Sequence, residues 1–289
     1  MRPLRMRLEE ARKRLGIPWE VLERDYLLSW VLAGIGQVES LRNALVFKGG
    51  TALKKCYFGD YRFSEDLDFS CVEGAPTGAA MEEAIGQACS TAAAMLNEYA
   101  SVEISWERYT EKEPHPGGQE AFTMRAQFSW HRQPHARVIV EASVDEQVLM
   151  PPRKRSVIHE YGEPLNARMG VYALEEIVAE KLRAILQHAE KLEHRGWSRS
   201  RARDYYDLWR VLQTYRDEMR LDDFRTLLTK KCAIRHVDFD GSEAFFEPTM
   251  LAYVERTWES WLGPLVADLR PERRTPRRAR HCRCGTAPA

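Results

Sequence analysis

The chain has 289 residues, of which 44% are hydrophobic and 30% charged, enough to bury a sizeable core as one bilobal unit or two small domains. No run approaches the ~18 apolar residues of a membrane span, and no apolar leader follows the N-terminus. We therefore expect no membrane partner and predict a cytoplasmic protein. Its six cysteines form no C-x-x-C pair, which favours reduced thiols over disulfides or a zinc site.

Positive and negative side chains balance at 43 each, but they are unevenly spread. Residues 270–289 hold seven arginines against one glutamate, so the rest of the chain carries a small acidic excess. This basic stretch also contains prolines and lacks apolar periodicity, which predicts a disordered tail. The tail either reaches RNA phosphates or only keeps the chain soluble.

Residues 1–42 carry apolar side chains at helical spacing, interrupted by Gly16-Ile17-Pro18, which predicts two helices. His131 and His135 flank Pro134 in a predicted hairpin, and ordinary surface or core roles are favoured for them over zinc binding. Further along the chain, the pattern predicts a helix over 81–99 and strands over 102–108, 122–130 and 137–144.

A glycine turn follows the apolar run Leu45-Val46-Phe47. Gly49 and Gly50 let the backbone approach a bound group closely, and Thr51 is placed to cap a helix over 52–57. Free N–H groups at a helix start favour an anion. The pattern therefore predicts a strand, a tight turn and a short helix that could cradle phosphate, with an ordinary turn as the alternative.

Two acids follow in the string Asp66-Leu67-Asp68-Phe69. Side chains alternate along a strand, so we expect Asp66 and Asp68 to share one face while Leu67 and Phe69 face a core. Like charges held side by side are costly unless a cation lies between them, and oxygen ligands at this spacing suit Mg²⁺ or Mn²⁺. The alternative is a solvated strand edge with two exposed acids.

Glu141 is out of place in the predicted buried strand over 137–144. A charge inside an apolar strand is uncommon unless it is paired or binds a metal. Two alternatives explain the same sequence: Glu141 forms a salt bridge, or Asp145 binds the metal in its place.

The sequence beyond Pro164 predicts helices, and two of these helices carry a charged residue on their apolar face. Lys181 lies within the stripe of the helix over 174–192, where triphosphate oxygens could pair with it; a snorkelling lysine is the alternative. Asp204 lies on the apolar side of the helix over 203–215, with Asp207 expected nearer the helix edge. An N-cap is the competing explanation for Asp204.

The connection from His194 to Arg203 contains four arginines and Trp197. Arginine suits phosphates and an aromatic ring suits a stacked base, so this segment is the predicted RNA contact. A flexible exposed connection is the alternative.

Four strings together resemble a known family. Gly-Gly followed by D-x-D is similar to the signature of polymerase-β-like nucleotidyltransferases, although the fourteen residues between Thr51 and Asp66 are at the long end. The strings K-G-G-T-A-L, R-F-S-E-D-L-D-F, A-E-K-L-R-A and R-D-Y-Y-D-L resemble the AbiEii/AbiGii toxin family within that superfamily, the toxin half of type IV abortive-infection toxin–antitoxin pairs. The resemblance runs from about residue 40 to about residue 215.

The resemblance implies an α+β, bilobal fold, with a mixed-sheet nucleotidyltransferase lobe over 1–165, a helical lobe over 166–269 and the basic tail over 270–289. It implies an Mg²⁺-dependent enzyme that transfers NMP from NTP to an RNA acceptor, with the tRNA 3′ end as the leading acceptor, inhibits translation and growth, and has a cognate antitoxin as partner. The rival interpretations are a same-fold enzyme that modifies a protein hydroxyl and a non-catalytic nucleotide-binding module.

The resemblance also assigns roles to residues. It implies catalytic roles for Asp66, Asp68, Lys181 and Asp204, with Asp204 opposite the lysine. Superfamily members place a third carboxylate on the strand beside the D-x-D, which would add Glu141 to Asp66 and Asp68 as metal ligands. The expected nucleotide-binding residues are Lys48, Gly49, Gly50, Thr51, Ser64 and Lys181.

Overall fold

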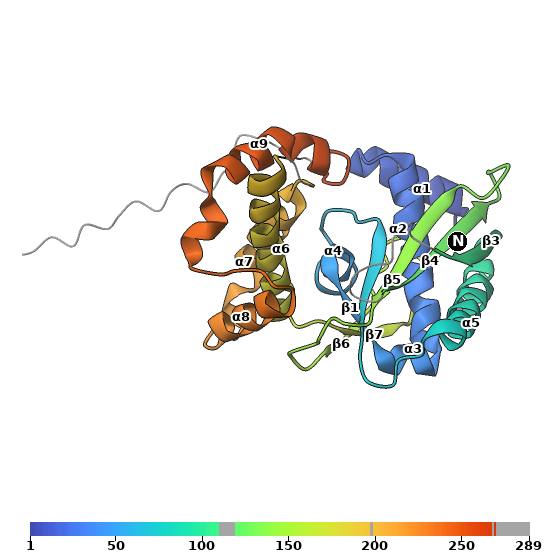
Figure 1. Cartoon of the computed structure of the whole chain (residues 1–289). Helices are drawn as coiled ribbons and strands as arrows, with labels where there is room; N and C mark the ends of the chain where they lie inside the picture. Colours follow the sequence, from blue (N-terminus) through green and yellow to red (C-terminus); the bar gives the residue numbers. More distant parts are fainter. Residues whose placement is uncertain (110–118, 197–198, 268, 270–289) are drawn as a thin grey trace, which may run out of the picture.

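A seven-stranded mixed sheet forms the N-terminal lobe, in a computed structural model that describes residues 1–109, 119–196, 199–267 and 269. The strands lie in the order β3-β4-β5-β2-β1-β7-β6 (Figure 1). Most neighbours are antiparallel, but β2 runs parallel to β5 and β1 parallel to β7. The strand bounds are β1 (Leu45–Lys48), β2 (Asp66–Cys71), β3 (Val102–Arg108), β4 (Gln119–Phe128), β5 (Ala136–Ser143), β6 (Arg153–Ser156) and β7 (Arg168–Val171).

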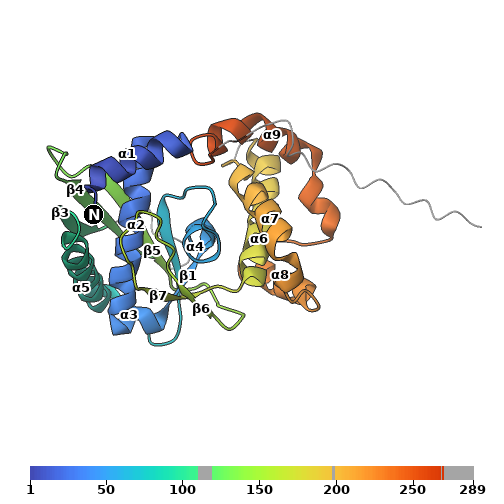
Figure 2. The same ribbon diagram turned by 180° about the vertical axis from the view of Figure 1, so that it is seen from behind.

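One long, almost fully buried helix supports this sheet. The helix, α2, packs against α5 and against strands β5 and β7, and its residues from Val21 to Gly36 are nearly all buried (Figure 2). Gly34 allows the close approach to α5, because a Cβ there would overlap the backbone of Ala88. The helices of this lobe are α1 (Leu4–Leu15), α2 (Trp19–Gln37), α3 (Glu39–Ala44), α4 (Gly49–Ala52) and α5 (Gly78–Asn97), with a π-helical turn, η1 (Leu53–Tyr57), directly after α4.

The second lobe is helical and stands beside the sheet, with α4 between the two (Figure 1). Two of its helices have capping residues at one end. Gly196 adopts φ +70° at the C-terminus of α6, and the Glu247 carboxylate accepts hydrogen bonds from the N–H groups of Thr249 and Met250 at the N-terminus of α9. The elements are α6 (Leu174–Arg195), α7 (Ala202–Tyr215), α8 (Phe224–Ile234) and α9 (Pro248–Leu262), with short 3-10 turns η2 (Arg216–Glu218) and η3 (Ser242–Phe246).

The α+β, bilobal fold is confirmed, and most predicted helices and strands are present within a few residues of their expected bounds. Two predictions differ: a third helix, α3, begins within residues 1–42, and the helix expected over 52–57 is divided into α4 and η1. Strands β6 and β7 were not predicted, because four charged or mixed residues give no alternating pattern. Strand β7 lies beyond the proposed boundary at 165/166, yet it pairs with β1 inside the sheet. No helix in the described ranges is long and apolar enough to cross a membrane.

Candidate active site

The glycine turn joins β1 to α4 and lies against strand β2. Gly49 adopts φ +78°, and a Cβ on it would lie 2.7 Å from the Asp68 Oδ2 atom, so only glycine lets the carboxylate come this close. The predicted capping role of Thr51 is wrong: α4 starts two residues earlier, with Lys48 at its N-cap. The Thr51 hydroxyl instead donates to the backbone carbonyl of Asp66 at 2.5 Å and so ties α4 to β2.

The two acids of the D-x-D string share one face of β2. Leu67 and Phe69 are fully buried on the other face, which confirms the predicted alternation. In the register of the sheet, Asp68 lies between Lys48 on β1 and Glu141 on β5. We call Asp66, Asp68 and Glu141 the strand carboxylates.

Strand β5 differs from the expectation that it is buried on both faces. Val138, Val140 and Ala142 are buried, whereas the residues that alternate with them, including Glu141, are half-exposed or exposed. Because residues paired across neighbouring strands point to the same side, Glu141 faces the same way as Asp68. The alternative metal ligand, Asp145, lies beyond the end of β5 and is exposed.

The electrostatic surroundings disfavour charge on the acids of β2. Burial raises the pKa of Asp68 to about 7; Glu141 and Asp66 add to the effect, while Lys48 opposes it. Burial and the neighbouring Glu65 raise the pKa of Asp66, against the pull of Arg24 and two other arginines. Among the residues that the structure describes, no cation forms a salt bridge with either of these two carboxylates. A divalent cation would therefore lower the free-energy cost of charging Asp66 and Asp68, which no salt bridge in the described residues does.

The donor set fits a hard cation. It consists of oxygen atoms alone, which suits Mg²⁺ or Mn²⁺. Within the described ranges, no three His, Cys, Asp or Glu side chains are arranged so that they could hold a metal ion. Mg²⁺ is usually bound by one or two carboxylates together with substrate phosphates.

Lys48 is buried and already has an anionic partner. Its ammonium donates to the Glu146 carboxylate; burial raises the pKa of Glu146, but Lys48, a hydrogen bond with Glu180 and the charge of Arg183 together lower it. Lys48 therefore lies between Glu146 and, across the strand pair, Asp68. Ser64 is half-buried in the segment that leads into β2. The nucleotide-binding roles expected for Lys48 and Ser64 stay predictions.

A second set of charges lies on the helical lobe. The Lys181 Nζ atom is 3.0 Å from Asp204 Oδ1 and 2.6 Å from Asp207 Oδ2, and all three side chains are largely buried. The inward orientation expected of Lys181 and Asp204 is confirmed. The prediction that Asp207 lies nearer the helix edge is wrong, because its side chain is fully buried and contacts three partners.

Arg62 completes this second set; it is the first residue of the string R-F-S-E-D-L-D-F, but no role was predicted for it. Its Nε and Nη2 atoms each donate to the Asp207 carboxylate at 2.6 Å, and the Tyr61 hydroxyl donates to the same group at 2.7 Å. The guanidinium also lies over Gly50, where any Cβ would overlap it. Arg62 therefore connects the glycine turn to α7. We call Arg62, Lys181, Asp204 and Asp207 the helix-lobe cluster.

The surroundings of the helix-lobe cluster favour the charged forms of its side chains. Burial alone would raise the pKa of Asp207, but Arg62 and Lys181 lower it to about 2. Burial also opposes charge on Asp204 and Lys181, but Lys181 and Arg201 lower the pKa of Asp204, and Asp207 and Asp204 raise the pKa of Lys181. These shifts favour the ionised forms of all three groups.

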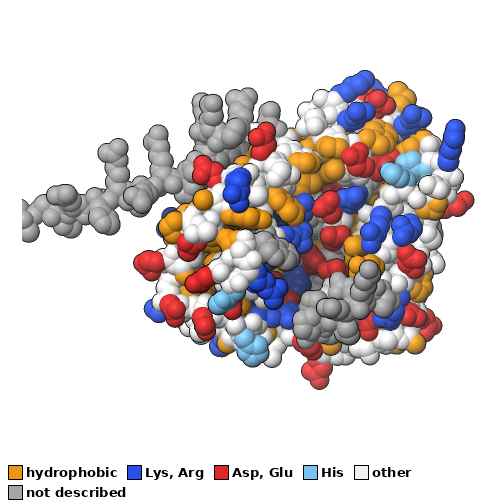
Figure 3. All heavy atoms as spheres, turned by 45° about the horizontal axis from the view of Figure 1, so that its top comes forward, with side chains coloured by type: hydrophobic (Ala, Val, Ile, Leu, Met, Phe, Trp, Pro, Cys, Tyr) orange, Lys and Arg blue, Asp and Glu red, His pale blue; other side chains and the backbone are white. Residues whose placement is uncertain are grey.

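Figure 3 shows a hollow on the face between the two lobes, with basic and acidic side chains gathered around it. Arg199 and Arg203 lie against the Trp261 ring, with 5.5 and 5.3 Å from each guanidinium carbon to the ring centre. Arg203 also reaches Glu65 at 3.1 Å, next to Asp66. These two arginines come from the predicted RNA contact; its Trp197, like the basic tail over 270–289, lies outside the described residues.

The chain matches the family described as nucleotidyl transferase AbiEii toxin, type IV toxin–antitoxin system, over residues 30–280. Among solved structures it is similar to MenT4, a nucleotidyltransferase toxin from Mycobacterium tuberculosis H37Rv, with 20% identity, coverage of 88% of this chain and 98% of that chain, and a TM-score of 0.46. The curated proteins gave no match. Because the family match spans most of its length, the chain belongs to the AbiEii family of nucleotidyltransferase toxins.

Proposed function

We propose that this nucleotidyltransferase transfers NMP from an NTP to an RNA acceptor in an Mg²⁺-dependent reaction, and that the acceptor is the 3′ end of tRNA. The observation that carries the proposal is the arrangement of the strand carboxylates. Asp68 and Glu141 lie abreast on neighbouring strands, Asp66 shares their face, and the glycine turn meets the Asp68 carboxylate directly.

The site would bind NTP through both lobes. Backbone N–H groups of Gly49, Gly50 and Thr51 open helix α4 and favour an anion, while the ammonium of Lys181 supplies positive charge from α6. Lys48 and the Ser64 hydroxyl would add contacts to the phosphates. Holding the nucleotide between these groups fixes its α-phosphate near the strand carboxylates, which is the positioning that phosphoryl transfer needs.

Asp66 and Asp68, with Glu141 as a third carboxylate beside them, would hold Mg²⁺ or Mn²⁺ together with the substrate phosphates, and the ion when bound would neutralise phosphate charge and make an acceptor hydroxyl a better nucleophile. The acceptor oxygen attacks the α-phosphorus in line, and pyrophosphate leaves. Lys181 would stabilise the charge that builds on the phosphates, and Asp204, 3.0 Å from the Lys181 Nζ atom, would keep that ammonium oriented.

A tRNA that carries extra nucleotides at its 3′ end cannot accept an amino acid, so the reaction would stop translation and growth. The type IV family description supports a cognate antitoxin as the partner that relieves this toxicity. A reaction on tRNA would place the protein in the cytoplasm.

The experiment incubates the full chain with each α-labelled NTP, Mg²⁺, and either total RNA or an RNA-free protein lysate. We expect label on tRNA, none with a metal chelator, and none on tRNA whose terminal ribose has been oxidised with periodate. Label on protein alone would favour the rival enzyme that modifies a protein hydroxyl. No labelled product with either acceptor would contradict the proposal.

A further inference from the structure

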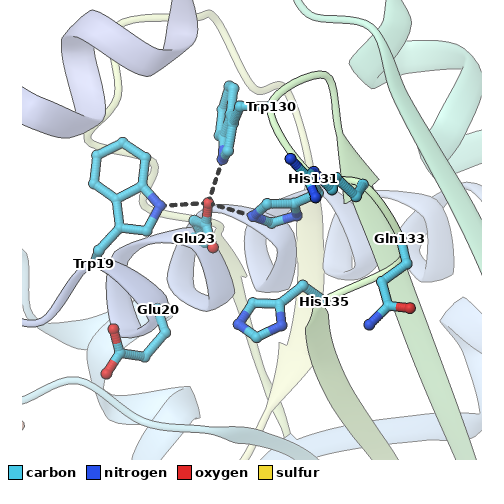
Figure 4. Close-up of a pocket in the computed structure, with 8 residues that line it drawn as sticks. Trp19, Glu20, Glu23, Trp130, His131, Gln133 and His135 are labelled. Atoms are coloured by element: carbon cyan, nitrogen blue, oxygen red, sulfur yellow. Dashed lines mark hydrogen bonds and ion pairs between the residues drawn. The ribbon is translucent and has the colours of Figure 1, made fainter.

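A pocket of about 410 Å³ lies outside the proposed active site, between the start of α2 and the turn that joins β4 to β5. Its walls include the half-buried indoles of Trp19 and Trp130, and Glu23 lies at its base (Figure 4). Glu20, His131 and His135 also line the pocket.

Glu23 is 1% exposed, yet all its bonds converge on one carboxylate oxygen. The Oε1 atom accepts from the indole nitrogens of Trp19 at 2.5 Å and Trp130 at 2.6 Å, and His131 Nε2 lies 3.0 Å away (Figure 4). The Oε2 atom is buried without a hydrogen-bond partner among the described residues. A buried carboxylate oxygen left without a donor is costly, so the pocket lacks one donor.

The charge of the pocket indicates which kind of donor would fit. Two carboxylates, Glu20 and Glu23, line it against one guanidinium, that of Arg132. The nearest arginine on α2, Arg24, turns away from Glu23 and binds Glu65 at 2.7 Å. A polyanion such as RNA would meet net negative charge here, whereas a cation would be attracted.

The aromatic rings favour the same ligand. The Trp19 and Trp130 rings meet edge-on, 5.9 Å between centres at 66°, and both are fixed by their bonds to Glu23. Indole faces attract cations, and an apolar wall also accepts the carbon chain that carries such a charge. Because a buried carboxylate lies beneath two indoles of fixed orientation, the pocket suits a ligand that carries both a positive charge and an alkyl chain.

We propose that this pocket binds an organic cation, an ammonium or guanidinium group on an alkyl chain, whose N–H groups donate to Glu23 Oε2 after a small side-chain adjustment. The ligand has two possible sources with the same chemistry: a free amine or guanidine, or a Lys or Arg side chain of another protein. The proposal is independent of nucleotidyl transfer.

Isothermal titration of the full chain with agmatine and putrescine tests the pocket, with the uncharged alcohol 1-pentanol as the matched neutral ligand. N-acetyl-arginine amide and N-acetyl-lysine amide represent the protein source. We expect the cations to bind at least about tenfold more tightly than the alcohol. Equal affinity of the amides and the free amines would indicate a protein side chain, and binding of the free amines alone would indicate a metabolite.

Variants test the assignment to Glu23. Glu23→Gln should lower cation affinity by about tenfold or more, and Trp19→Leu by about fivefold. Because Glu23 is buried and its variant could lose stability, Glu20→Gln at the exposed rim provides a second test, with an expected loss of about twofold. Glu39→Gln, exposed on α3, is the matched control and should change nothing. Cation affinity equal to that of the alcohol, affinity unchanged in both folded Glu23→Gln and Trp19→Leu, or binding of cytidine or adenosine in preference to the cations, would overturn the proposal.

Discussion

Two sets of carboxylates belong to the proposed active site, the half-buried strand carboxylates and the more deeply buried aspartates of the helix-lobe cluster, and their surroundings act on their charges in opposite ways. At the strand carboxylates, burial and mutual repulsion raise the pKa of Asp68 to about 7. At the helix-lobe cluster, Arg62 and Lys181 lower the pKa of Asp207 to about 2. The first set has too little positive charge around it, and the second is paired at distances of 2.6 to 3.0 Å.

This difference indicates a division of roles between the two lobes. A group that is costly to keep charged weakens the fold and is retained for chemistry, whereas a fully paired buried group supports the structure. The strand carboxylates should therefore be dispensable for folding and required for transfer. The helix-lobe cluster should be required for both, because it also connects Gly50 to α7 through Arg62.

The largest expected effect is on transfer when a strand carboxylate loses its charge. Asp68→Asn keeps the shape of the side chain but removes a charged oxygen ligand, so nucleotidyl transfer should fall by about a thousandfold. The melting temperature should stay the same or rise, because the variant removes a charge that burial disfavours. Transfer is measured in single-turnover reactions with labelled NTP.

Asp145→Asn is the matched control, since Asp145 is an exposed acid just beyond β5. It should transfer nucleotides at the wild-type rate. Wild-type transfer by a folded Asp68→Asn protein would remove the strand carboxylates from the mechanism.

The next largest effect is on stability. Asp207→Asn leaves Arg62 and Lys181 without their shared carboxylate, and breaking a buried pair of this kind costs about 3–5 kcal/mol. Urea unfolding measures the loss. Asp217→Asn, an exposed change on η2, should cost less than about 0.5 kcal/mol. A loss at Asp207 no greater than that of the control would mean that the cluster does not hold the lobes together.

A smaller effect is the coupling between Lys181 and Asp204. Each single alanine change removes one partner of the other residue, so that, among the described residues, Lys181 keeps only Asp207 and Asp204 keeps only Arg201 as a salt-bridge partner. Changing both residues should therefore cost less than the sum, with a coupling of about 1–3 kcal/mol. Lys181→Ala should weaken NTP binding as well as transfer, whereas Asp204→Ala should chiefly slow transfer. A double-mutant cycle on turnover and on unfolding measures the coupling, and additivity in both would separate the two residues.

The last expected effect is on the pH dependence of stability, and its sign differs between the two sets. The folded protein binds a proton at Asp68 more tightly than the unfolded chain, since the pKa is raised from 3.8 to about 7. Asp68 therefore makes a favourable contribution to the free energy of unfolding at low pH, and this contribution is lost as the pH rises from about 4 to about 7. The melting temperature of Asp68→Asn should exceed that of the wild type increasingly over this range.

Asp207 provides the opposite case. Its pKa is lowered to about 2, so its contribution is present above about pH 4 and is lost as the pH falls towards about 2. The difference between wild type and Asp207→Asn should shrink in acid. The same pH profile for both variants would show that their surroundings do not differ.

Local periodicity predicted much of this arrangement. Alternation placed Asp66 and Asp68 on one face, and the 3.6-residue repeat turned Lys181 inward, because both patterns depend only on near neighbours. Asp207 follows Asp204 by three residues, and such residues share a helix face, so the same rule would have shown that it is buried.

The remaining features depend on distant contacts. Arg62 lies outside any regular element, and its partner is 145 residues away in the sequence. Strands β6 and β7 are four residues each and are held by pairing with each other and with β1. No nearby pattern of letters encodes such contacts.

Cation binding tests the central claim most directly. In an isothermal titration of Mg²⁺ into the full chain with a non-hydrolysable NTP analogue, the wild type should take up the ion. Asp204→Asn should do so with an affinity within about fivefold, because its carboxylate belongs to the paired cluster. Asp68→Asn should lose this uptake. Equal Mg²⁺ affinity in Asp68→Asn and the wild type would contradict the assignment of the strand carboxylates as the site of chemistry.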